Sequence, residues 1–343
     1  MRLRSNPSRL APAATVAMLL AAAASLAGQT PQAPRQVSKA ARPHVPPKTA
    51  DGQPDLQGYW TNSTYTPLER PANVNKEFYT PDEFAALVKK AAASESEQTT
   101  PGTVADVHYD FSQFGLDRSQ STLASNLRTS LIVDPPDGRI PALTPEGQRI
   151  VAARAEAAKG VGRWDAAQTN QLDDRCLMMN GAGPPMMDAG YNSNYHIVQG
   201  PGYVMILTEM IHDARIIPLD GRAQPPATMR QWMGFSRGHW EGNTLVVETT
   251  NLNGKNPFRG STEKMRVTER FTRVAEDVIQ YRFTIDDPSM WTRSWTGEMP
   301  MQKTTGPIFE HACHEGNYGL YNTLVGARLE EKKAVEAAGR QPK

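Results

Sequence analysis

Imidazole and carboxylate side chains recur in the second half of this chain, and they are groups that transfer protons in enzymes. His239 and Glu241 share a face if this segment is a strand, because side chains alternate along strands. Glu269 falls on the apolar face of another strand, where a carboxylate needs a partner or a proton. His314 follows a cysteine. We therefore predict His239, Glu269 and His314 as candidate catalytic residues.

Glu241, Glu269 and His314 also have structural interpretations. Glu241 precedes the Gly242-Asn243 turn, where a carboxylate is usually solvated. A bulge in the strand would turn Glu269 outward. His314 would bond backbone groups beside a disulfide. These alternatives stay open at the level of sequence.

Tryptophans and a polar corner supply candidate ligand-binding residues. Trp291 and Trp295 are four residues apart, so on a strand they would share a face and stack on a sugar or aromatic ligand. Trp240 lies in the same region. His212 and Arg215 follow a strand and are predicted at the rim of a cavity. Core packing and turn formation are the alternatives.

The sequence predicts neither a metal site nor a cofactor. His311-x-x-His314-Glu315 does not have the order of the His-Glu-x-x-His zinc motif. Phosphate loops, dinucleotide fingerprints, Cys-x-x-Cys pairs and serine elbows do not occur in the sequence.

The elements that must position these residues are mainly strands. From Tyr195 onward apolar residues recur with period 2, and turn residues separate the runs. In residues 278–285, Ile279, Tyr281 and Phe283 share one face. We predict a mainly β fold, an antiparallel meander forming a barrel or sandwich with two or three peripheral helices. The other predicted strands are 56–60, 131–134 paired with 139–140, 195–199, 203–209, 214–219, 237–241, 244–250, 264–271 and 291–302.

Helix-start signals occur in two places. Thr80-Pro81-Asp82-Glu83 is a capping box with proline at the first helical position. Thr144-Pro145-Glu146 repeats this signal before an alanine- and arginine-rich run. A third, charged helix is predicted from Leu324 to Ala338.

The N-terminus has the zones of a Sec signal peptide. Arg2, Arg4 and Arg9 precede an apolar run, and Ser25-Leu26-Ala27 provides small residues for cleavage. We predict a periplasmic or secreted protein. The predicted regions are a signal peptide at 1–27, a disordered tether at 28–50, an N-terminal segment with short strands and two helices at 51–194, a β core at 195–322 and a C-terminal helix and tail at 323–343.

The charge balance limits the classes of possible binding partner, and the cysteine content predicts a disulfide. With 37 Lys and Arg against 36 Asp and Glu, the chain has no strong positive field, which argues against nucleic acid as partner. We predict no membrane anchor after cleavage, leaving a small molecule as the expected ligand. Cys176 and Cys313 are the only cysteines, and an oxidising compartment favours a disulfide between them.

Five motifs occur along the chain: Asp51-Gly52-Gln53-Pro54-Asp55-Leu56-Gln57-Gly58, Ile211-His212-Asp213-Ala214-Arg215, Gly238-His239-Trp240-Glu241-Gly242-Asn243-Thr244-Leu245-Val246-Val247, Asp286-Asp287-Pro288 with Trp291-Thr292, and Cys313-His314-Glu315-Gly316-Asn317-Tyr318. In these motifs the chain resembles a family of exported bacterial proteins that carries no assigned activity. The Trp-Glu-Gly-Asn-Thr-Leu hairpin is also similar to lipocalin-like barrels, and this similarity implies a barrel that holds a ligand.

Three classes of function are compatible with the sequence. The first is an extracytoplasmic protein that binds a small apolar or sugar-like molecule in a β-sheet cavity. The second is a cofactor-independent hydrolase, lyase or isomerase that uses His/Glu acid–base chemistry. The third is an interaction protein of the cell envelope. A cavity with convergent His239, Glu269 or His314 would favour the enzyme.

Overall fold

The structure is a computed structural model that describes residues 44–95, 125–179 and 181–339. The predicted signal peptide, residues 1–27, lies outside these residues, as does most of the predicted tether, residues 28–50. In the described part of the chain, no helix is both long enough and apolar enough to cross a membrane.

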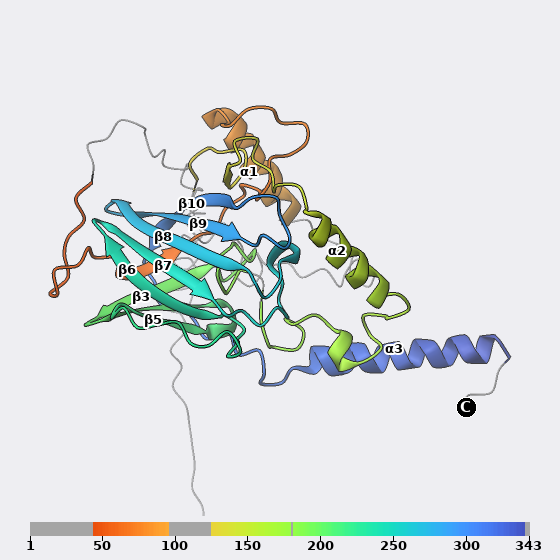
Figure 1. Cartoon of the computed structure of the whole chain (residues 1–343). Helices are drawn as coiled ribbons and strands as arrows, with labels where there is room; N and C mark the ends of the chain where they lie inside the picture. The colour runs from red at the N-terminus through yellow and green to blue at the C-terminus, as the bar shows by residue number, and fades with distance from the viewer. Residues whose placement is uncertain (1–43, 96–124, 180, 340–343) are drawn as a thin grey trace, which may run out of the picture. The chain divides into compact units, whose positions relative to one another are not determined.

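Ten antiparallel strands form one sheet among the described residues, which confirms the predicted mainly β class (Figure 1). Hydrogen-bonded neighbours follow the order β5-β4-β3-β1-β10-β9-β8-β7-β6, and β2 pairs with β10 beside this path. The bounds are β1 Gly58–Thr61, β2 Ile132–Asp134, β3 Asn194–Gly200, β4 Tyr203–Thr208, β5 Ala214–Pro218, β6 Phe235–Glu241, β7 Thr244–Thr250, β8 Arg266–Ala275, β9 Val278–Asp286 and β10 Trp295–Thr304. Strand β1 therefore joins two meanders, β3 to β5 and β6 to β10.

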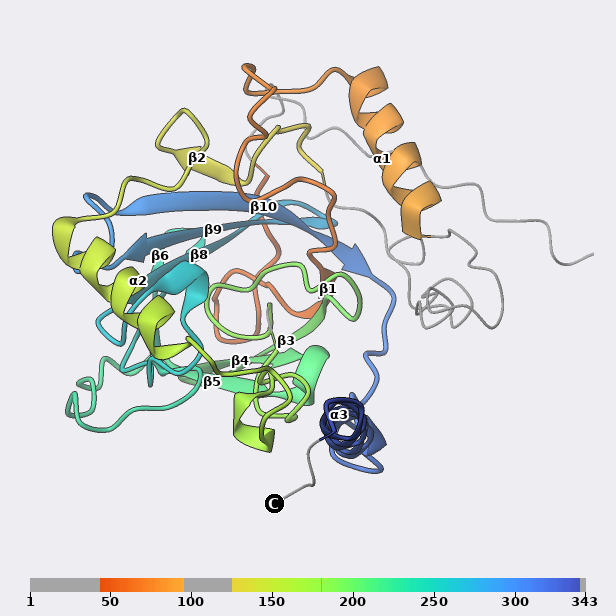
Figure 2. The ribbon, with the colours of Figure 1, turned by 90° about the vertical axis from the view of Figure 1, so that its right-hand side faces the viewer.

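The sheet is curled so that its end strands β5 and β6 approach each other. Arg215 of β5 bonds to Glu269 of β8, although these strands lie far apart in the hydrogen-bonding order. At Gly238 of β6, an added Cβ would lie 3.0 Å from Cγ2 of Ile217 in β5. Among the described strands no ladder joins β5 to β6, so the sheet is not closed into a barrel. Figure 2 shows β3, β4 and β5 below β8, β9 and β10.

The concave face of the sheet forms the core. In β9, Ile279, Tyr281, Phe283 and Ile285 are all fully buried, which confirms the predicted period of 2. Burial of each such side chain contributes roughly 1.5–3 kcal/mol. The same alternation in β8 places Glu269 on this apolar face.

A methionine-containing loop, residues 177–187 apart from residue 180, packs on the concave face. The amide of Met186 donates to the hydroxyl of Tyr281 at 2.9 Å, and Asn62 Nδ2 donates to the carbonyl of Met186 at 3.3 Å. Thr208 Oγ1 donates to the carbonyl of Ala182 at 3.3 Å. The face therefore packs on the chain's own residues, unlike the hollow interior that the lipocalin-like similarity implies.

The capping signals position two helices as predicted. Helix α1 spans Pro81–Glu95, and its capping box forms in both directions, because Glu83 N donates to Thr80 Oγ1 and Thr80 N donates to a Glu83 carboxylate oxygen. Helix α2 spans Pro145–Ala157 and is capped by the side chain of Thr144.

The C-terminal helix is longer than the sequence predicts. Helix α3 spans Tyr318–Ala337, and it starts early because the Asn317 side chain accepts the amide of Leu320 at 3.2 Å. Arg328 of α3 donates to the carbonyls of Trp164 and Asp165, both at 3.0 Å.

One predicted strand pairing is wrong. Residues 131–134 do not pair with residues 139–140; β2 pairs with β10 instead. The amide of Ile140 donates to the Glu69 side chain at 3.0 Å and is not available for a hairpin ladder. The long strand β10 offers β2 a backbone edge, which a turn motif alone does not reveal.

Candidate functional site

A buried ion pair joins the two ends of the curled sheet. Arg215 Nη1 and Nη2 donate to the two carboxylate oxygens of Glu269 at 3.1 and 2.5 Å, and the side chains are only 3% and 0% exposed. Nη2 also donates to Ser236 Oγ of β6 at 3.2 Å and lies 3.5 Å from Thr249 Oγ1 of β7. Arg215 thus links β5 to β6, β7 and β8 without a backbone ladder.

The electrostatics of this pair favour the charged form of Arg215. Burial lowers the pKa of Arg215, but attraction to and hydrogen bonding with Glu269 outweigh burial and raise its pKa overall. The hydroxyl of Tyr281 donates to Glu269 Oε1 at 2.8 Å. Burial first, and then the charge of Glu269, raises the pKa of Tyr281 well above its usual value. The network therefore consists of an ion pair and a neutral phenol.

The structure does not bring His239 and Glu269 together. His239 shares a face of β6 with Glu241, as predicted, and its Nε2 lies 3.2 Å from Glu241 Oε1. Its side chain is 53% exposed, on the face opposite to the core. Arg270 donates to Glu241, and this bond and that of His239 lower the pKa of Glu241. His239 therefore belongs to an exposed charged cluster.

His212 and His314, the two other predicted histidines, are also exposed. His212 ends a 3₁₀ turn, Met210–His212, at the corner between β4 and β5, with a positive φ of 56°. His314 follows the disulfide and its carbonyl accepts the amide of Asn317 at 3.3 Å. Both positions fit the turn and backbone roles given above as alternatives.

The three predicted tryptophans pack in or against the core. Trp295 is fully buried at the start of β10, whereas Trp291 precedes this strand. Their rings meet edge to face, with centroids 5.7 Å apart. Trp240 lies half-buried against the same core. The predicted strand from Trp291 therefore begins four residues later, and the shared face becomes a packing contact.

The predicted disulfide forms between Cys176 and Cys313, which are 137 residues apart in the sequence. It links the segment that precedes the methionine-containing loop to the segment that precedes α3. Asn317, which caps α3, also donates to the carbonyl of Asp174 at 2.9 Å.

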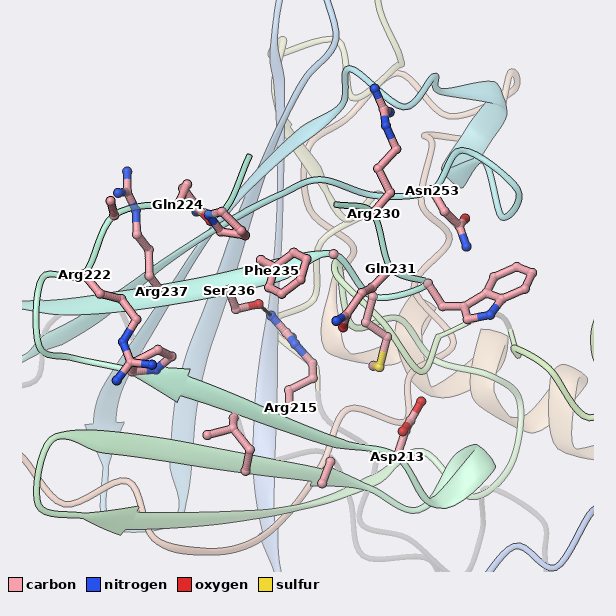
Figure 3. A pocket seen from close by; sticks show the side chains of 18 residues that line it. Asp213, Arg215, Arg222, Gln224, Arg230, Gln231, Phe235, Ser236, Arg237 and Asn253 are labelled. Carbon is pink, nitrogen blue, oxygen red and sulfur yellow. Dashed lines mark hydrogen bonds between the residues drawn. The ribbon is translucent and has the colours of Figure 1, made fainter. Parts of the chain in front are cut away.

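A cavity of about 730 Å³ opens between β5 and β6, and Arg215 lies on its wall (Figure 3). Strand β5, strand β6 and the connection between them, residues 219–234, supply most of the lining. Trp232, Met233 and Phe235 give it an apolar part. Its other lining residues are Asp213, Ala214, Ile216, Pro218, Arg222, Ala223, Gln224, Pro225, Arg230, Gln231, Gly234, Ser236, Arg237 and Asn253. Of the predicted ligand-binding residues, Arg215 alone lies here.

Two buried donors of this lining have no acceptor among the described residues. They are Nε of Arg215 and Nε2 of Gln224. A buried N–H without an acceptor costs about 1–3 kcal/mol, more when it is charged. Both nitrogens are closed to solvent, so an oxygen acceptor in the cavity would remove this cost only after the lining side chains shift.

The lining residues of the 219–234 connection were missed at the level of sequence. This stretch contains two prolines and no period of 2 or 3.6. The available signal was composition: Gln224, Arg230, Gln231 and Trp232 combine amides, a cation and an indole within nine residues.

Comparison with protein-family models, with curated proteins and with solved structures finds no match to this chain. The chemistry of the cavity is therefore inferred from its own residues. Among the described residues, no group of three or more histidine, cysteine or acidic side chains is arranged to hold a metal ion.

Proposed function

We propose that this protein is an extracytoplasmic binding protein that holds a small sugar-like molecule in the cavity between β5 and β6. The observation that carries the proposal is the pair of buried donors, Arg215 Nε and Gln224 Nε2, in the lining of one cavity. A saccharide presents many oxygen acceptors, and these would reach both donors once the lining side chains shift to admit it. The export signal predicted from the sequence and the disulfide are compatible with an oxidising compartment.

The remaining lining supports a sugar-like ligand more than a purely apolar one. Trp232 and Phe235 offer aromatic surface against which a pyranose ring can pack. Gln231 and Asn253 add amide groups that both donate and accept. Half of the lining residues are polar or charged, which suits a ligand that carries many hydroxyl groups.

Binding is supported better than acid–base catalysis. Among the described lining residues Asp213 is the only acid, and none is a histidine. Glu269 is held by Arg215 and Tyr281, and His239 lies in the exposed cluster with Glu241.

The proposal is tested by blocking the cavity. Ala223 is an exposed residue of the lining, so Ala223→Trp should fill the cavity with little strain. Ala72→Trp, at an exposed turn outside the lining, is the matched control. Saturation-transfer NMR with a panel of neutral and acidic mono- to trisaccharides should detect binding to the wild type and to the control only.

Native mass spectrometry of protein recovered from the periplasm gives a second measurement. We expect a co-purified small molecule that Ala223→Trp removes. If neither the saccharide panel nor the native protein shows binding that depends on Ala223, the proposed function is wrong.

A further inference from the structure

A second cavity of about 680 Å³ adjoins the first. The two cavities share three lining residues, Gln224, Arg230 and Arg237, which form the wall between them. The far part of the second cavity includes Lys264, Met265, Arg266 and Pro288, together with the acids Glu263 and Asp286. Each volume falls within the range of a complete small-molecule site. One monosaccharide would therefore leave most of the combined space unused.

The shared wall is rich in donors. Arg230 Nη1 donates to the carbonyls of Leu252 and Glu263 at 3.4 and 3.2 Å, so its described partners are main-chain groups and not carboxylates. Gln224 adds its buried Nε2 donor. Arg237 is paired with Glu248 at 3.1 Å, but this pair is exposed and therefore weak.

Two other cations line the second cavity, and each lies near an acid. Lys264 Nζ lies 3.7 Å from a carboxylate oxygen of Glu146, and Arg266 stands opposite Asp286 in the β8–β9 register. In the first cavity Arg215 is held by Glu269. Arg230 is thus the cation of the shared wall that has no carboxylate partner among the described residues, and its Nε and Nη2 groups make no described bond. A guanidinium binds a carboxylate with two parallel hydrogen bonds.

We infer that the ligand is an acidic oligosaccharide that spans both cavities and places a carboxylate on Arg230. This inference rests on the proposed function, because it names the class of molecule that the same site takes. One sugar unit packs against Trp232 and Phe235 in the first cavity. The next unit extends past Gln224 and Arg237 into the second.

Calorimetric titration with three probes tests the inference: trigalacturonate, monomeric galacturonate and the neutral maltotriose. Trigalacturonate should bind most tightly, and its affinity should fall as the salt concentration rises. Arg230→Gln should weaken trigalacturonate binding at least about tenfold, the scale of one charge-assisted bidentate contact. Maltotriose binding should change little in this variant.

Arg270→Gln is the matched control, because Arg270 is an exposed arginine of β8 whose partner is Glu241, outside both cavities. Arg230→Lys should recover only part of the affinity, since an ammonium lacks the planar fork. Unchanged melting temperatures of these variants would show that the losses come from binding.

The outcomes separate the two proposals. If maltotriose binds as tightly as trigalacturonate, or if Arg230→Gln has no effect, the acidic class is overturned and the binding function stands. Equal affinity for the monomer and the trimer overturns the two-cavity arrangement. If no probe binds in a manner that Ala223→Trp blocks, the inference and the proposed function both fail.

Discussion

Replacing Glu269 with glutamine tests the ion pair on which the curled sheet depends. Glutamine keeps the shape of the side chain and an oxygen acceptor for Tyr281, whose hydroxyl lies 2.8 Å from Glu269 Oε1. The substitution removes the negative charge that faces Arg215. Because Arg215 is only 3% exposed, its guanidinium would remain buried without a counter-ion.

The expected cost follows from this burial. Removing one partner of a buried ion pair destabilises proteins by about 3–5 kcal/mol, which is a large part of the roughly 5–15 kcal/mol that stabilises a typical domain. Adding Arg215→Met removes the unpaired charge, so the double variant should recover part of the loss. Together with Arg215→Met alone, these variants complete a double-mutant cycle that gives the coupling energy of the pair.

Urea unfolding followed by circular dichroism is the assay, and the midpoint is compared among variants. Glu241→Gln is the matched control, because Glu241 forms the same kind of pair with Arg270 at 2.5 Å on the exposed face. Its midpoint should stay close to that of the wild type. A loss below about 1 kcal/mol for Glu269→Gln, typical of a surface substitution, would refute the reasoning.

Two further predictions concern the disulfide and pH. The Cys176–Cys313 disulfide closes a loop of 137 residues, so the chain-entropy model predicts that it stabilises the fold by about 5 kcal/mol. The double variant Cys176→Ser, Cys313→Ser should therefore have a much lower melting temperature. Two freely alkylated thiols in unreduced, unfolded wild type would rule out the bond. Desolvation lowers the pKa of His196, which stacks on Tyr59 with ring centroids 4.3 Å apart. The unfolded chain therefore binds this proton first, and stability should be complete above pH ~6.5 and fall as the pH drops from there toward the folded pKa. His196→Gln should flatten this part of a pH-dependent melting curve, and an unchanged slope would contradict the assignment.

Local signals explain why much of the fold could be predicted. The Thr80 capping box and the Thr144 cap act within four residues, so the starts of α1 and α2 are readable from sequence. Alternation in β9 is likewise local, and it assigns Tyr281 and Phe283 to the core. Strand partners depend on distant residues instead, which is why the pairing of β2 with β10 was not found.

The candidate site was less predictable for the same reason. The alternation of β8 places Glu269 inside and indicates that it needs a partner, but that partner, Arg215, is 54 residues away in sequence and reaches it only because the sheet curls. Trp291 and Trp295 were predicted on one strand face, yet the turn before β10 makes them a core contact. Gln224 and Arg230 lie in an aperiodic connection, so periodicity does not reveal them.

The most direct test of the account is an NMR titration that follows arginine Nε–H signals while the tightest-binding saccharide of the panel is added. Arg215 and Arg273 are both buried, but Arg273 Nε already donates to the carbonyl of Glu276 at 3.2 Å, whereas Arg215 Nε has no acceptor among the described residues. Arg273 also lies outside both cavities that share Arg230. We predict that the Arg215 signal shifts with the binding isotherm while the Arg273 signal stays in place. Saccharide binding that leaves the Arg215 signal unmoved would contradict the assignment of this cavity as the binding site.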